Sequence, residues 1–102
     1  MPLTPAEKQE LKRQVAESLS AEKEVRRVVV FGSFLNSEDP CDMDIAVFQD
    51  STEAYLPLVM KYRRKLTSIA DRVPVDVIPI RPDPRPCALL EEIEKGEIIY
   101  ER

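Results

Sequence analysis

A glycine–serine pair between two apolar segments most constrains how this chain can fold. The pair, Gly32-Ser33, directly follows the β-branched run of residues 27–31, and the chain has only two glycines in all. A run of this kind is typical of a strand buried on both faces. A polar, proline-containing loop then leads to Asp42 and Asp44, at the entrance of a second apolar segment over residues 44–48. The sequence therefore predicts two buried strands, with a tight turn after the first and two carboxylates at the start of the second.

Hydrophobic spacing predicts alternating helices and strands over the rest of the chain. Apolar residues three and four positions apart predict helices over residues 5–19 and over residues 88–95. A further helix is expected from the candidate capping residues 50–52 to about residue 71. A short helix is expected near Ser33, and strands over 73–80 and 97–100. Pro57 leaves the start of the second long helix open, because proline beyond the first turn clashes with the preceding turn. Gly96 is expected to cap the last helix.

Composition limits the size and the class of the protein. With 102 residues, 43% of them hydrophobic, we expect a single domain over residues 1–102. The net charge of −4 argues against a protein that grips nucleic acid tightly. The sequence has no histidine, and its two cysteines, Cys41 and Cys87, are not in a CxxC spacing, which excludes zinc fingers and His-based catalysis. Because neither a signal segment nor a membrane span is recognisable, we expect a cytoplasmic protein without a membrane partner.

Three aspartates are candidate metal ligands. Asp42 and Asp44 stand two apart at the start of a strand, so their side chains point to the same face, and Asp76 lies within another apolar strand. Two unit charges about 4 Å apart repel by about 4 kcal/mol at an effective dielectric near 20, so such a cluster needs protons or a cation. Magnesium fits an all-oxygen site best. The alternatives are a solvated loop edge for the first two and, for a buried Asp76, an ion pair with Arg72 or Arg81.

Gly32 and Ser33 are candidate phosphate ligands. Glycine allows a close approach of the backbone, and backbone N–H groups with the serine hydroxyl can hold a phosphate. The sequence lacks both GxxxxGK[ST] and GxGxxG, which excludes a P-loop and a Rossmann site. A tight turn without a ligand is the alternative for this pair.

The segment from Gly32 to Asp44 resembles the GS…DxD signature of the nucleotidyltransferase superfamily that includes DNA polymerase beta, in particular its minimal single-domain members. The resemblance extends to Asp76, in the place of the third carboxylate, and to the Glu-Lys-Gly-Glu-Ile-Ile-Tyr ending. It implies an α/β fold with a short mixed β-sheet flanked by helices. It also implies that Asp42, Asp44 and Asp76 are catalytic ligands of two Mg²⁺ ions, with Mn²⁺ as the alternative, and that Gly32 and Ser33 bind the nucleotide.

The same resemblance implies an activity and a partner. The expected reaction transfers a nucleoside monophosphate, AMP from ATP, to a hydroxyl of a partner macromolecule and releases pyrophosphate. The expected partner is a small helical HEPN-domain protein, which the chain would modify and silence as the antitoxin of a toxin–antitoxin system. Many family members carry a small residue, a basic residue and a second glycine after the Gly-Ser, whereas this chain has Leu35, Asn36 and Ser37. The alternative is therefore a catalytically silent domain that acts by binding its partner, and the oligomeric state is open.

Overall fold

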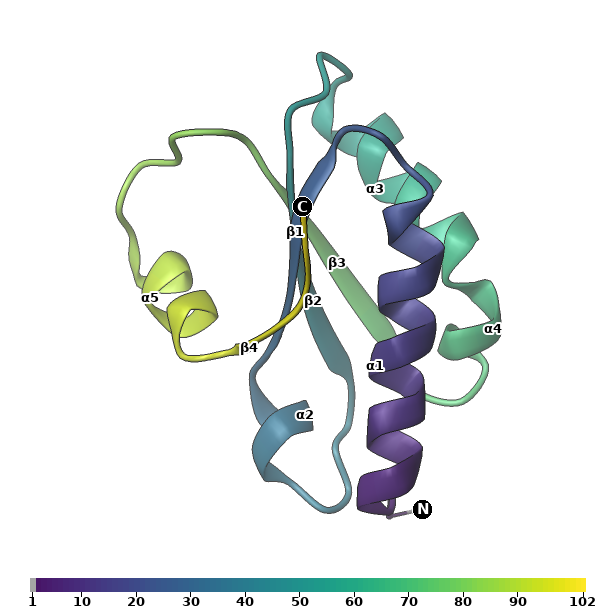
Figure 1. Ribbon diagram of the computed structural model, residues 1–102. Helices are drawn as coiled ribbons and strands as arrows, with labels where there is room; N and C mark the ends of the chain where they lie inside the picture. Colours follow the sequence, from purple (N-terminus) through teal and green to yellow (C-terminus); the bar gives the residue numbers. More distant parts are fainter. Residues whose placement is uncertain (1) are drawn as a thin grey trace.

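The computed structural model describes residues 2–102 and shows a four-stranded sheet with helices on both faces (Figure 1). The strands are β1 (Val25–Phe31), β2 (Met43–Gln49), β3 (Val75–Ile80) and β4 (Glu97–Glu101). The helices are α1 (Pro5–Ser20), α2 (Ser33–Asn36), α3 (Tyr55–Lys65), α4 (Thr67–Ala70) and α5 (Ala88–Glu94). The strand order is β3-β2-β1-β4; β2 and β3 are parallel, and the other neighbours are antiparallel. The expected α/β fold with a short mixed sheet is confirmed.

Helix α1 forms where its sequence signals predict it. The N–H of Glu7 donates to the Thr4 hydroxyl at 3.1 Å, and the N–H of Thr4 donates to the Glu7 carboxylate at 3.0 Å. This capping box satisfies two N–H groups that the first turn of a helix leaves without partners. The apolar stripe of Leu11, Val15 and Leu19 is fully buried against the sheet.

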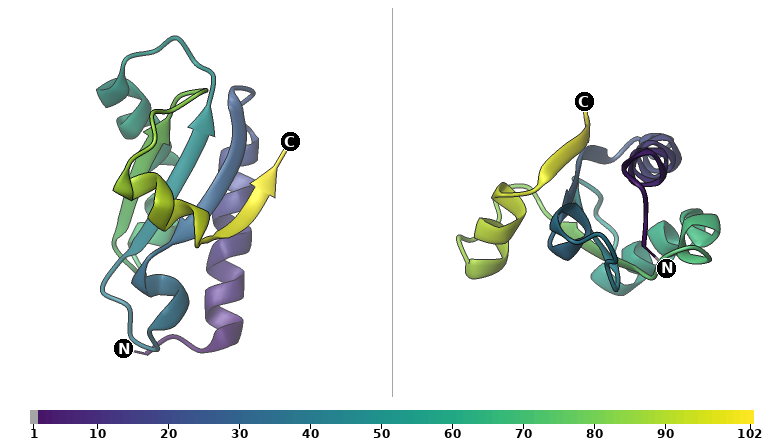
Figure 2. Two further views of the ribbon diagram at one scale, coloured as in Figure 1. Left: turned by 90° about the vertical axis from the view of Figure 1, so that its left-hand side faces the viewer. Right: turned by 90° about the horizontal axis from the view of Figure 1, so that it is seen from below.

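The two faces of the sheet are covered unequally. Helices α1, α3 and α4 lie on one face, while α5 alone lies on the other (Figures 1 and 2). The first face carries the larger core, to which the alternate residues Val75 and Val77 of β3 contribute. The second face carries a smaller core that includes Phe31, Ala46 and Ile93. Helices therefore cover this second face less completely than the first.

The predicted helix from about residue 50 to 71 is two helices in the structure. The first of the two, α3, begins at Tyr55, so Pro57 lies in its first turn. The backbone N–H groups of a first turn have no partner within the helix, so a proline there costs no hydrogen bond. The predicted helix breaks at Leu66, whose φ of −105° and ψ of 17° leave the helical region, and α4 follows. The side chain of Leu66 is fully buried, so the break keeps an apolar residue in the core.

The prediction that Gly96 caps the last helix is wrong. Gly32 is the only described glycine with a positive φ, and the residue that caps α5 is Lys95. A Cβ atom at Gly96 would lie 2.5 Å from the carbonyl oxygen of Val30. Glycine is needed there because the chain packs directly against β1.

Among the described residues, no helix has the length and apolar character that crossing a bilayer requires.

Candidate active site

The three candidate aspartates meet at one end of the sheet. Phe31, the last residue of β1, pairs with Asp44 at the start of β2, and Asp44 pairs in turn with Asp76 of β3. Asp42 directly precedes β2. The register of the parallel β2–β3 pair therefore brings Asp76, which follows Asp44 by 32 positions in the sequence, next to the other two aspartates.

The carboxylates are close enough to share a cation. One oxygen atom from each of Asp42, Asp44 and Asp76 lies within 4.8 Å of the others. Asp42 and Asp44 are half-buried, and Asp76 is exposed. Burial of Asp76, which its apolar neighbours in the sequence suggested, is wrong, because β3 is an edge strand and α5 does not extend over its first residues.

Arginine does not neutralise the cluster. Within residues 2–102, no lysine or arginine forms an ion pair with any of the three aspartates, and Arg72 instead pairs with Glu7 at 3.1 Å. Burial, followed by the negative charges of Asp42 and Asp76, raises the pKa of the Asp44 carboxyl above its usual value. The donors are all oxygen atoms, and their mutual repulsion is of the kind that a hard divalent cation relieves.

Gly32 lies against one of these carboxylates. Its φ is +79°, and a Cβ atom built on it would lie 2.7 Å from the Oδ2 atom of Asp44. Any other residue would be strained in its backbone and would also displace the Asp44 side chain. The exposed Ser33 follows at the start of α2. The predicted phosphate-binding pair thus adjoins the predicted metal ligands.

The N-terminal segment supports the loop that leads to Asp42, a role that the sequence did not suggest. The ammonium group of Lys8 donates to the carbonyl oxygen of Ser37 and lies 5.4 Å from the centre of the Phe34 ring. The N–H of Leu3 donates to the carbonyl oxygen of Glu38 at 2.9 Å. No sequence signal marks these contacts, since they join residues about 30 positions apart.

The chain matches the family model of the polymerase beta nucleotidyltransferases over residues 13–102. Its fold is similar to a chain in the complex of the tri-AMPylated Shewanella oneidensis HEPN toxin with its MNT antitoxin, with a TM-score of 0.68 and 20% identity over 93% of this chain and 73% of that one. No curated protein matches the sequence.

Two further solved structures are similar in fold. One is the toxin–antitoxin complex MntA–HepT, with a TM-score of 0.67 and 19% identity over 92% of this chain and 73% of that one. The other is a toxin–antitoxin complex with AMP-PNP, with a TM-score of 0.70 and 19% identity over 89% of this chain and 73% of that one. At these identities the likeness establishes the shared fold.

Proposed function

Because this chain belongs to the polymerase beta nucleotidyltransferase family, we propose that it is a magnesium-dependent enzyme that transfers AMP from ATP to a hydroxyl group of a partner protein. The observation that carries the proposal is the cluster of carboxylate oxygens from Asp42, Asp44 and Asp76, all within 4.8 Å of one another. The cluster adjoins the Gly32-Ser33 turn, because a Cβ atom at Gly32 would lie 2.7 Å from the Oδ2 atom of Asp44.

The residues of the cluster fit magnesium, which prefers carboxylate oxygens and keeps several waters. Asp42, Asp44 and Asp76 would hold the ions, which supply charge neutralisation for the attacking and leaving oxygens of an in-line displacement. Gly32 and Ser33 would orient the triphosphate through the backbone N–H groups and the hydroxyl. As the acceptor oxygen bonds to the α-phosphorus and pyrophosphate leaves, the exposed Asp76 would accept the acceptor's proton.

We further propose that the partner is a small helical HEPN-domain protein encoded beside this chain, and that the chain acts as its antitoxin in the cytoplasm. One of the similar solved structures is the complex of a tri-AMPylated HEPN toxin with an MNT antitoxin, and the two others are toxin–antitoxin complexes, of which one contains AMP-PNP.

The test is the mass of the partner. The chain and the neighbouring HEPN protein are co-purified, incubated with ATP and magnesium, and the HEPN protein is measured by intact-mass spectrometry. We expect one or more added AMP units with the wild type and none with Asp44→Asn. Asp71→Asn changes an exposed aspartate at the end of α4 and is the matched control that keeps the activity.

Two outcomes would contradict the proposal. Unmodified HEPN protein in a stable wild-type complex would favour the silent, binding-only alternative. Undiminished modification by Asp44→Asn would exclude Asp44 as an essential metal ligand.

A further inference from the structure

Helix α2 begins directly after Gly32, so the contacts that hold α2 also hold the Gly32-Ser33 turn. The helix has only four residues, and a helix of this length is not stable by itself. The N–H of Leu35 donates to the carbonyl oxygen of Gly32 at 3.2 Å, and the N–H of Ser37 donates to that of Ser33 at 2.8 Å. The shape of the turn therefore depends on these two hydrogen bonds and on contacts from the rest of the fold.

Ser37 connects this turn with the loop that leads to Asp42. Besides its N–H bond to Ser33, its hydroxyl accepts a hydrogen bond from the N–H of Asp39 at 3.2 Å. Its carbonyl oxygen accepts a hydrogen bond from the ammonium group of Lys8, which precedes it by 29 positions. One residue thus joins the turn, the loop and the N-terminal end of α1, which lie at the same end of the sheet (Figures 1 and 2).

The half-buried Lys8 contacts α2 in two ways. The carbonyl oxygen that it binds belongs to Ser37, the residue that ends α2, where carbonyl groups have no partner within the helix. The ammonium group also lies 5.4 Å from the centre of the fully buried Phe34 ring, within the range of a cation–π contact. Residues 32–44 contain four acidic residues and no basic one, so Lys8 supplies this segment with a positive charge.

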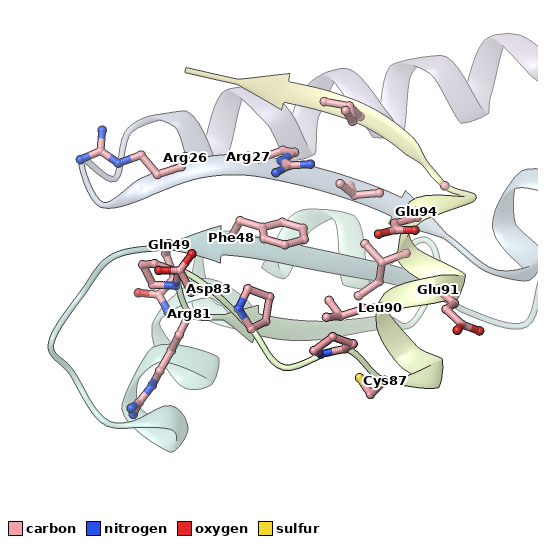
Figure 3. A pocket seen from close by; sticks show the side chains of 17 residues that line it. Arg26, Arg27, Phe48, Gln49, Arg81, Asp83, Cys87, Leu90, Glu91 and Glu94 are labelled. Carbon is pink, nitrogen blue, oxygen red and sulfur yellow. The ribbon is translucent and has the colours of Figure 1, made fainter.

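A groove of about 850 Å³ lies elsewhere, on the second face of the sheet, between the sheet, α5 and the loop of residues 81–87 (Figure 3). None of the three aspartates and no residue of α2 lines it. The guanidinium group of Arg27 lies there, 4.6 Å from the centre of the Phe48 ring, and the exposed Arg81 also lines the groove. Because arginine side chains line it, this groove is the alternative site for ATP.

We propose that Lys8 is a positioning residue of the candidate active site. By holding the Ser37 carbonyl and the Phe34 ring, it keeps α2 and the Gly32-Ser33 turn in the shape that binds the triphosphate. Lys8 acts through α2 and not on the substrate itself. This inference rests on the proposed function, in which the turn binds ATP.

The test compares three forms of the full chain: wild type, Lys8→Met and Lys8→Arg. Methionine keeps an unbranched side chain beside Phe34 and a similar helix propensity, but it has neither the charge nor the donor. We expect Lys8→Met to bind ATP with magnesium about tenfold more weakly by calorimetry, because a charged hydrogen bond no longer holds the binding segment. The amide hydrogens of Leu35 and Ser37 should exchange about tenfold faster by NMR, because α2 opens more often. Lys8→Arg should restore both values, since arginine keeps the charge and the donors.

Lys12→Met is the matched control. It removes another ammonium group from α1, one turn further along, where Lys12 pairs with Glu97 of β4 at 2.9 Å. We expect wild-type ATP affinity and wild-type exchange at α2, even if the melting temperature falls as far as in Lys8→Met. The comparison separates the positioning of α2 from a general loss of stability, and circular dichroism checks that each variant is folded.

Every other result contradicts a stated part of the inference. Unchanged ATP affinity in Lys8→Met overturns it, with or without faster exchange, and so do equal losses in Lys12→Met. Lys8→Arg that behaves as Lys8→Met does would exclude the hydrogen bond as the cause. If Arg81→Glu weakens ATP binding and Lys8→Met does not, ATP binds in the groove, and the inference is wrong. A wild type that does not bind ATP with magnesium would overturn the proposed function itself, and the role of Lys8 with it.

Discussion

At the scale of single residues, Asp44 combines partial burial with two like charges nearby. Its folded-state pKa is raised by burial and by Asp42 and Asp76. In the unfolded chain an aspartate titrates near pH 4. Because the folded pKa is the higher one, the protein loses stability as the pH rises from about 4 through that raised value.

Asp44→Asn should therefore stabilise the metal-free protein. In EDTA at pH 7 we expect the free energy of unfolding to rise by about 0.5 to 1 kcal/mol, in the range of exposed charge interactions. Below about pH 4 the gain should vanish, because Asp44 is then protonated in the wild type as well. Urea unfolding at several pH values measures this, with Asp71→Asn as the control. A variant less stable than the wild type at pH 7 would instead indicate that Asp44 has a structural role.

The sequence predicts the placement of these residues in part. The spacing of two puts Asp42 and Asp44 together, because side chains alternate along a strand. The approach of Asp76 depends on strand register, and its exposure depends on the edge position of β3, neither of which is local. The contact between Gly32 and the Asp44 carboxylate likewise arises only when β1 and β2 pair.

At the scale of elements, a partly buried hydrogen bond joins α3 to the loop before β1. The hydroxyl of Tyr62 donates to the Glu24 carboxylate at 2.8 Å, and Lys61 pairs with the same carboxylate at 2.9 Å. Burial acts to raise the pKa of Glu24, yet the hydrogen bonds from Lys61, its own backbone and Tyr62 hold it below its usual value. The stabilisation by Glu24 is thus present above about pH 4 and is lost as the pH falls through the lowered pKa.

Tyr62→Phe should loosen this attachment of α3. The ring remains in the core, but the charged hydrogen bond is lost, so we expect a loss of about 1 to 2 kcal/mol in unfolding free energy at pH 7. The melting temperature should fall by about 5 to 10 °C, and the difference should shrink as Glu24 becomes protonated. Tyr55→Phe at the exposed start of the same helix is the control and should change little. An equal effect of the two substitutions would contradict a specific role for the Glu24 bond.

Element boundaries show where local signals are sufficient. The start of α1 is predicted correctly because Thr4 and Glu7 cap each other within four residues of sequence. The break at Leu66 is not predicted, because the periodicity of apolar residues continues through it to Ile69. Tertiary packing decides that break, and also the requirement for glycine at position 96, where β1 is the neighbour.

At the scale of the whole molecule, the two faces of the sheet differ in how far helices cover them. The helices α1, α3 and α4 enclose the larger core on one face. The other face carries Asp44, Asp76 and the groove, and α5 alone covers it. The alternation of helices and strands predicts this fold class, whereas the groove is formed by segments far apart in the sequence and has no sequence signal.

Binding of nucleotide to the second face of the sheet should stabilise the entire domain. If ATP with magnesium binds only the folded state, a concentration ten times the dissociation constant adds about 1.4 kcal/mol to the unfolding free energy. For a domain of this size the melting temperature should then rise by about 5 to 10 °C. Differential scanning fluorimetry with the co-purified partner present measures the shift, and ATP with EDTA is the control that should remove it, because Asp42, Asp44 and Asp76 repel a bare triphosphate. A shift that is the same with and without magnesium would contradict a role for the three aspartates in nucleotide binding.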